Sequence, residues 1–152
     1  DPRDLHSFPT RRSSDLIPHW AGVAANPDGP EHSAGKKFTE THKVVFTKTL
    51  AESAWENTVL AKGSLVDEIT KLKKQAGQDI IAYGGATFVS ALIRHGLIDE
   101  FHLFINPTAI GSGMTIFKEL ESKQNLRLIK SSPFDCGIVV LHYEPKREEI
   151  TA

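Results

Sequence analysis

Cysteine, methionine and long apolar runs are scarce in this sequence, which has one cysteine and one methionine in 152 residues. A single cysteine excludes an internal disulfide bond and is typical of a reducing compartment. No apolar run approaches the ~20 residues of a membrane-spanning helix. The first residues are polar and include three arginines, so we expect no signal peptide. These observations predict a cytoplasmic protein that does not contact a membrane.

An excess of charge of either sign is also lacking. The 18 Lys and Arg residues nearly balance the 19 Asp and Glu residues, which gives a net charge of −1. This balance argues against electrostatic capture of nucleic acid, and a hydrophobic content of 39% argues against disorder. A chain of 152 residues is long enough for one domain with a sizeable core. We therefore expect a globular domain without a nucleic-acid partner.

The histidines and the cysteine show no metal or nucleophile motif. Three of the seven histidines, His95, His102 and His142, fall in separate predicted elements without H-E-x-x-H or Cys-x-x-Cys spacing. We therefore predict no metal site, and structural or surface roles for the histidines. On one strand Cys136 and His142 are roughly 20 Å apart at ~3.3 Å per residue, too far for a nucleophile–base pair. Cys136 is predicted to be a small core residue.

The N-terminal region differs from the rest of the chain in its composition and residue pattern. Residues 1–16 contain two prolines, paired arginines and paired serines without an apolar period. They resemble the translated read-through of a sequencing adapter, so we interpret them as a non-native tail; the alternative is an ordinary flexible tail. Residues 17–35 hold three prolines and predict a loop-rich stretch, in which 17–20 form the tail of a helix. Residues 36–41 predict a short helical turn.

A strand, a glycine pair and a helix follow one another in residues 79–96. Residues 79–83 predict a buried strand, because their apolar run is short and contains β-branched side chains. Gly84 and Gly85 allow close backbone approaches that a Cβ would forbid. The helix that follows ends at Gly96, and its apolar face is formed by Phe88, Val89, Leu92 and Ile93. Its free N–H groups suit a phosphate; the alternative is that the glycines serve packing only.

The remaining segments predict an α/β fold. Ser64 is a good N-cap for a helix over 64–76, and residues 132–135 predict a hairpin turn. In the strand 99–105, Phe104 opposes the apolar face and indicates that both sides are covered. The other strands are expected at 43–47, 57–61, 126–131 and 136–143. This order of elements predicts a mostly parallel sheet with right-handed crossovers and an antiparallel edge.

Three segments carry a resemblance to a known family. They are KVVFTKTL (43–50), DIIAYGGATFVSALIRHGLIDEFHLFINP (79–107) and PTAIGSGMTIF (107–117). Together with the closing strands they resemble the dihydrofolate reductase-like family, most closely the reductase domain of the bifunctional riboflavin-biosynthesis deaminase–reductase. The resemblance implies a three-layer α/β/α fold around a mostly parallel sheet with an antiparallel C-terminal edge.

The resemblance also implies an oxidoreductase that uses NADPH. The glycine pair, joined by a cis peptide in that fold, and the helix start would hold the pyrophosphate. These residues are Gly84, Gly85, Ala86, Thr87 and Phe88. The end of the strand 43–47 would lie beside the adenosine 2′-phosphate, through Thr47, Lys48 and Thr49; the alternative for Lys48 is a solvated lysine. Ser112 and Met114 would lie near the reaction pocket, and Trp20 would either line the substrate pocket or serve packing.

The chain also departs from that family. The strand, flexible loop, helix and second strand with which the family begins are lacking here, so we expect residues 17–147 to form a partial reductase domain followed by a tail, 148–152. The resemblance therefore assigns no catalytic residue in this chain and does not imply that the chain is active. The expected substrate is a pterin or a pyrimidine precursor of riboflavin, as in 5-amino-6-(5-phosphoribosylamino)uracil reductase, with a homodimer left open. The alternatives are a nucleotide-binding domain without turnover and a plain α/β domain.

Overall fold

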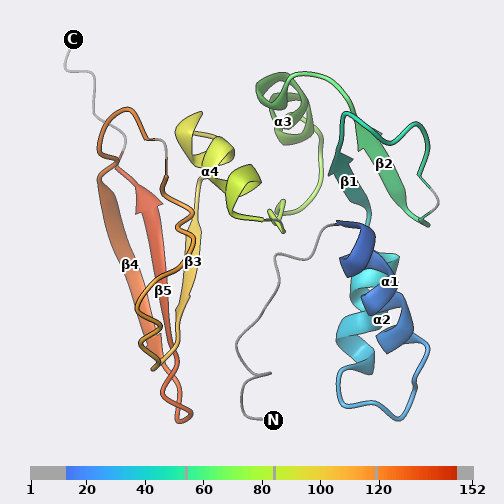
Figure 1. The fold of residues 1–152 in the computed structure, drawn as a ribbon, viewed down its shortest axis with the longest axis horizontal. Coiled ribbons are helices and arrows are strands. Elements are labelled where there is room, and N and C mark those ends of the chain that lie inside the picture. Colours follow the sequence, from blue (N-terminus) through green and yellow to red (C-terminus); the bar gives the residue numbers. More distant parts are fainter. Residues whose placement is uncertain (1–12, 54, 84, 119, 147–152) are drawn as a thin grey trace. The chain divides into compact units, whose positions relative to one another are not determined.

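The computed structural model describes residues 13–53, 55–83, 85–118 and 120–146. Its elements are α1 (Ser13–Ala24), α2 (His32–Glu40), β1 (Lys43–Phe46), β2 (Thr58–Ala61), α3 (Leu65–Lys73), α4 (Ala86–Arg94), β3 (Phe101–Ile105), β4 (Leu126–Pro133) and β5 (Val139–Pro145) (Figure 1). The chain divides into two compact units, Asp1–Gly85 and Ala86–Ala152. The first holds a parallel pair of strands and the second an antiparallel three-stranded sheet, so the predicted mixed α/β class is confirmed.

Two packed helices open the first unit, where the sequence predicted a loop-rich stretch. Pro18 lies inside α1, and the other two prolines of residues 17–35 fall in the connection to α2, where a missing N–H costs little. Trp20 stacks on Phe38 with ring centroids 5.6 Å apart. Buried Gly35 lets α2 approach α1 so closely that an added Cβ would lie 2.7 Å from the Ala24 amide nitrogen. This packing, of which Trp20 is part, overrides the local proline signal.

The region predicted as a non-native tail lies mostly outside the described residues. Of residues 1–16, only 13–16 are described, and they form the first turn of α1. The C-terminal segment 148–152, predicted as a second tail, lies outside the described residues as well.

The parallel pair β1 and β2 matches the two strands predicted at 43–47 and 57–61. Val44 stands opposite Val59, and Val45 opposite Leu60. The helix α3 follows at once, and the Ser64 hydroxyl caps it by accepting a hydrogen bond from the Asp67 N–H at 3.5 Å, as predicted. The helix ends at Lys73, three residues before the predicted end.

The strand predicted at 79–83 is not formed. These residues have no β-structure, and the side chain of Ile81 is 83% exposed. A strand needs a neighbour to pair its backbone N–H and C=O groups, and no described strand pairs with this segment. Tyr83 instead packs edge-on against Phe38, at 5.9 Å between ring centroids. The sequence signal was apolar and β-branched, but pairing depends on the rest of the sheet.

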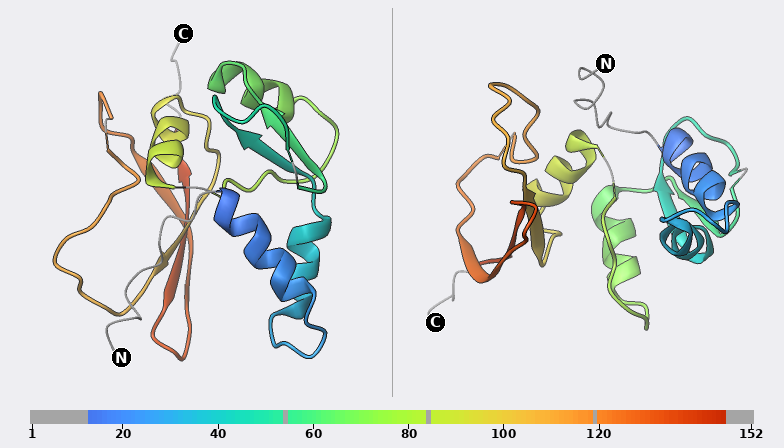
Figure 2. Two further views of the ribbon diagram at one scale, coloured as in Figure 1. Left: turned by 45° about the vertical axis from the view of Figure 1, so that its right-hand side comes forward. Right: turned by 90° about the horizontal axis from the view of Figure 1, so that it is seen from below.

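The helix α4 has the predicted bounds and buried face. It begins directly after Gly85, and Leu92 and Ile93 are each only 2% exposed. Gly96 ends it with φ +62°, and the Leu97 N–H donates to the Leu92 carbonyl at 2.9 Å. Figure 2 shows α4 alongside β3. No helix in the described chain is long and apolar enough to cross a membrane.

The second sheet has the order β3-β5-β4 and is antiparallel throughout. Phe101 is buried on the face that also packs Phe117, at 5.9 Å between ring centroids. The prediction that both faces are covered is wrong, since Phe104 is 66% exposed. The β4–β5 hairpin is confirmed, but β5 begins three residues later than predicted. Cys136 therefore lies exposed in the turn, and its predicted core role is also wrong.

Candidate cofactor-binding site

The first group of predicted cofactor residues forms a turn after β1. The Thr47 N–H donates to the Ala61 carbonyl at 3.2 Å and so continues the pairing of β1 with β2. The Thr47 hydroxyl oxygen accepts hydrogen bonds from the N–H groups of Thr49 and Leu50, both at 3.2 Å. These bonds hold the turn closed from within. The Thr47 hydroxyl also lies 3.5 Å from the Thr49 hydroxyl, and either group can donate in this hydrogen bond.

Lys48 lies at the tip of this turn, and its side chain is exposed. Among the described residues no ion-pair or hydrogen-bond partner is recorded for its ammonium group. A mobile ammonium at the carboxyl end of a parallel strand is suited to an anionic ligand, because such strand ends commonly face ligands in α/β proteins. The assignment of Lys48 to the cofactor site stays a prediction, with a solvated lysine as its alternative.

The second group begins with the glycine pair. Gly84 lies outside the described residues, so the predicted cis peptide between the two glycines does too. Gly85 is half-buried and directly precedes the helix α4. The first turn of α4 contains no acidic residue, and Thr87 is exposed beside its N–H groups. This end of the helix carries the partial positive charge that favours a phosphate.

The structure therefore forms the two local features that the sequence predicted. Thr47, Lys48 and Thr49 share one turn, and Ala86, Thr87 and Phe88 share the first turn of α4. The first group and Gly85 belong to the first compact unit, whereas Ala86, Thr87 and Phe88 belong to the second.

The loop after β3 contains the predicted ligand contacts Ser112 and Met114. Gly111 has φ +73°, and the Ser112 N–H donates to the Ile110 carbonyl at 2.8 Å, which makes a tight turn. Met114 is 71% exposed. Farther along, the Ile116 carbonyl accepts a hydrogen bond of 2.7 Å from the buried Ser90 hydroxyl. The loop is thus anchored to α4 at one end and exposed at its turn.

A hydrogen-bonded lysine in the first unit was missed by the sequence reasoning. Lys43 Nζ donates to the carbonyls of Thr39 at 2.8 Å and Thr41 at 2.7 Å, and so caps the end of α2. It also lies 5.9 Å from the centre of the Phe38 ring. Burial lowers the pKa of Lys43, and Glu56 opposes this effect. The sequence showed Lys43 only as the first residue of a strand.

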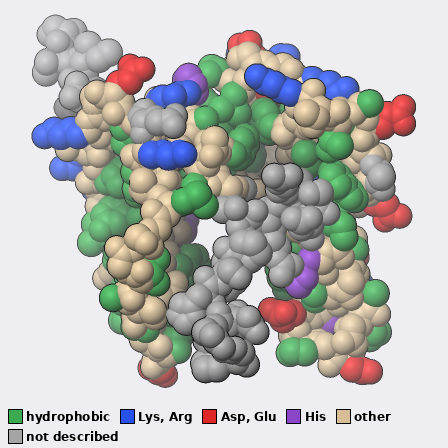
Figure 3. Space-filling view, viewed as in Figure 1, with side chains coloured by type: hydrophobic (Ala, Val, Ile, Leu, Met, Phe, Trp, Pro, Cys, Tyr) green, Lys and Arg blue, Asp and Glu red, His purple; other side chains and the backbone are tan. Residues whose placement is uncertain are grey.

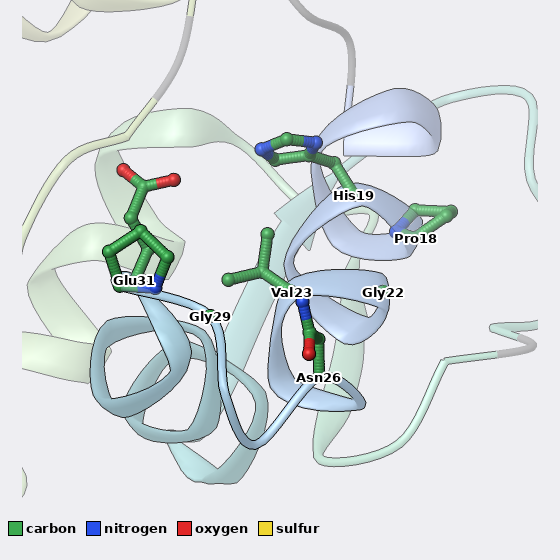
Figure 4. A pocket seen from close by; sticks show the side chains of 8 residues that line it. Pro18, His19, Gly22, Val23, Asn26, Gly29 and Glu31 are labelled. Atoms are coloured by element: carbon green, nitrogen blue, oxygen red, sulfur yellow. The ribbon is translucent and has the colours of Figure 1, made fainter.

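Two surface depressions were also missed, because their linings come from turns and helix ends without a motif. One, of about 430 Å³, lies between α1 and the connection to α2; Figure 4 shows His19 and Glu31 among its lining residues. The other, of about 680 Å³, lies at the end of α4. Its basic lining residues are Arg94, His95, Lys123 and Lys146. Neither depression contains the predicted cofactor residues.

Comparisons with known proteins match most of the chain. The family model of the RibD C-terminal domain matches residues 22–140. The uncharacterized protein YyaP of Bacillus subtilis (strain 168) is 32% identical over 133 residues, which are 88% of this chain and 70% of YyaP. YwjB of the same organism is 37% identical over 73 residues, 48% of this chain and 41% of YwjB.

Two solved structures share the fold. One is a protein from Shewanella sp. PV-4 whose name assigns it to riboflavin biosynthesis, with a TM-score of 0.59 and 23% identity over 94% of this chain and 86% of that one. The other is a pyrimidine reductase-like protein from Corynebacterium diphtheriae, with a TM-score of 0.52 and 19% identity over 69% of this chain and 50% of that one. Because the family model covers well over half of the sequence, the chain belongs to the RibD C-terminal domain family.

Proposed function

We propose that this chain is a reductase domain that uses NADPH to deliver hydride to a small nitrogen heterocycle. The observation that carries the proposal is the family match over residues 22–140, which includes both the turn after β1 and the start of α4. The names of the two structural neighbours, which mention riboflavin biosynthesis and pyrimidine reduction, support a pyrimidine as the substrate. A pterin is the other heterocycle of this class.

Each of the two groups of residues suits one part of a dinucleotide that carries an extra phosphate. The N–H groups at the start of α4 would bind the pyrophosphate. The first turn of α4 contains no acidic side chain that would repel the phosphates. Lys48 and the hydroxyl protons of Thr47 and Thr49 would bind the 2′-phosphate. The cofactor, when bound, supplies the hydride, while these residues bind and orient it.

Cofactor titration of the purified chain tests the proposal. Gly85→Val places a branched side chain where the pyrophosphate must approach, and we expect NADPH affinity to fall by at least about tenfold. Gly77→Val is the matched control, because an added Cβ at Gly77 meets nothing within 4 Å. Unchanged NADPH affinity in Gly85→Val would remove α4 from the cofactor site.

The same titration separates the alternatives. Absence of NADPH binding by the unchanged chain would favour a plain α/β domain whose glycines serve packing. Binding without oxidation of NADPH in the presence of a pyrimidine or pterin substrate would favour a nucleotide-binding domain without turnover. Binding with substrate-dependent oxidation supports the reductase.

Cofactor choice provides a second test. Lys48→Glu reverses a charge that would contact the 2′-phosphate, and a charge-assisted hydrogen bond contributes about 1.5–3 kcal/mol. We therefore expect NADPH affinity to fall by about 10- to 150-fold, while NADH affinity changes little. Lys123→Glu makes the same charge change in the segment that precedes β4, outside this turn, and should affect neither cofactor. Equal losses for NADPH and NADH in Lys48→Glu would exclude Lys48 from the 2′-phosphate site.

A further inference from the structure

Three side chains with metal-binding atoms meet on one face of the β3-β5-β4 sheet. His102 on β3 stands directly opposite His142 on β5. Glu100 precedes His102 by two residues, so the two side chains lie on the same face. Ligand atoms of all three residues lie within 4.8 Å of one another. Strand pairing thus joins residues that are far apart in the sequence.

The distances are close to those of a metal centre. Glu100 Oε2 lies 3.1 Å from His102 Nε2 and 3.1 Å from His142 Nε2. Donors bound to one tetrahedral ion at about 2.0–2.1 Å are separated by about 3.3 Å. The two carboxylate–imidazole separations are therefore within a few tenths of an ångström of those in a coordination shell, and a turn of the exposed His102 ring would aim its nitrogen at the same ion.

Hydrogen bonding alone does not satisfy this cluster. His102 Nε2 is within hydrogen-bonding geometry of the carboxylate, but the buried His142 Nε2 has no hydrogen-bond partner despite its 3.1 Å approach. The two rings are stacked, with centroids 4.4 Å apart and planes 15° apart. Protonating both rings would bring two positive charges face to face. A neutral ring whose proton is on Nδ1 leaves the Nε2 lone pair for a cation.

We propose that Glu100, His102 and His142 form a binding site for a divalent transition-metal ion of the Zn²⁺, Ni²⁺ or Cu²⁺ class. Two imidazole nitrogens and one carboxylate oxygen suit these ions, whereas Ca²⁺ and Mg²⁺ prefer oxygen ligands. Three protein ligands leave a fourth position for water. Because His102 and Glu100 are each more than half exposed, the ion can enter from solvent and the His102 ring can turn out of its stacked position.

The neighbouring charges limit the strength of this site. Lys130 on β4 stands opposite His142, so its positive charge opposes a bound cation. Glu144 does not compensate for it, since its carboxylate is paired with Arg127 at 2.7 Å. The expected site is therefore accessible and exchangeable, unlike a closed structural zinc site.

Metal titration of the full chain, produced without an oligohistidine tag, tests the proposal. We expect one Zn²⁺ per chain in competition with a chromophoric chelator. His102→Gln and His142→Gln should each weaken binding by more than about tenfold, a loss that even indirect changes near a metal often cause. His95→Gln is the matched control, because His95 is exposed and lies in the turn after α4. Equal affinity in the unchanged chain and in His142→Gln would overturn the proposal.

A spectroscopic measurement on the unchanged chain does not depend on how the variants fold. Substoichiometric Cu²⁺ should give an electron paramagnetic resonance spectrum with coupling to two imidazole nitrogens. Far-UV circular dichroism would show whether each variant keeps its fold before its affinity is compared. A Cu²⁺ spectrum without coupling to two nitrogens would exclude the two-histidine site.

Discussion

At the scale of single residues, Gly35 decides how closely α1 and α2 pack. A Cβ at this position would lie 2.7 Å from the Ala24 amide nitrogen and 2.8 Å from Val23 Cγ1. We expect Gly35→Ala to destabilise the chain by about 1–3 kcal/mol, the usual cost of overpacking, although alanine favours helices. Urea unfolding provides the measurement.

Gly22 in α1 is the matched control for this substitution. Nothing lies within 4 Å of a Cβ at Gly22, so Gly22→Ala adds helix propensity without a clash. It should stabilise the chain by about 0.5–1 kcal/mol. If the two alanine variants changed stability in the same direction, the close approach of α1 and α2 would not be the controlling factor.

The lowered pKa of Lys43 leads to a prediction about how the stability of the chain depends on pH. Burial lowers its pKa in the folded chain, with Glu56 opposing, so the unfolded chain binds more protons between that lowered pKa and the ordinary value of 10.5. Stability contributed by Lys43 should therefore rise with pH across this window. The free energy of unfolding of the unchanged chain minus that of Lys43→Met should therefore increase from neutral pH upward. A difference that shrinks as pH rises would contradict the lowered pKa.

At the scale of elements, the positive φ of Gly96 fixes the end of α4. Gly96 has φ +62° and open space around a Cβ, so Gly96→Ala tests backbone strain without a clash. The expected loss is about 1–2 kcal/mol. Gly77 has similar open space but no positive φ, and Gly77→Ala should change stability by less than about 0.5 kcal/mol. Thermal unfolding of both variants provides the measurement. Equal losses of stability in the two variants would show that the positive φ of Gly96 is not the cause.

Elements whose signals lie within a few residues could be predicted from the sequence. Ser64 as a cap, Gly96 as a stop and the β4–β5 hairpin were found because the backbone groups that they satisfy are local. The local sequence could not predict whether a strand forms at 79–83, because a strand is stable only when another strand pairs with it. The helices α1 and α2 were predicted only in part, as a helix tail at 17–20 and a helical turn at 36–41, because their stability comes from mutual packing through Gly35.

The same distinction between local signals and pairing of distant segments applies to the site residues. The turn at Thr47 and the helix start at Ala86 were recognisable, because each is built from consecutive residues. The cluster of Glu100, His102 and His142 was not, and the sequence pattern led to the opposite expectation of no metal site. Its geometry depends on the register that places His102 opposite His142. A change of one residue in that register would put the two side chains on opposite faces.

At the scale of the whole molecule, the balance between buried and exposed apolar side chains is unusual. In the described residues only six hydrophobic side chains are buried, whereas fourteen large ones are exposed. Figure 3 shows hydrophobic side chains on the surface among the charged ones. Among the described residues of the second unit, β3 pairs with β5 alone. Unpaired strand edges with apolar side chains favour association between chains.

We therefore predict that the chain self-associates through the outer edge of β3. Ile105 lies on this strand and is 49% exposed, and Ile105→Lys should reduce association because a lysine at a strand edge opposes pairing. Ile110→Lys is the control, since Ile110 is also exposed but lies in the loop beyond β3. Sedimentation velocity over a concentration series distinguishes a homodimer from larger assemblies. A monodisperse monomer in the unchanged chain, or equal effects of both lysines, would show that the β3 edge does not drive association.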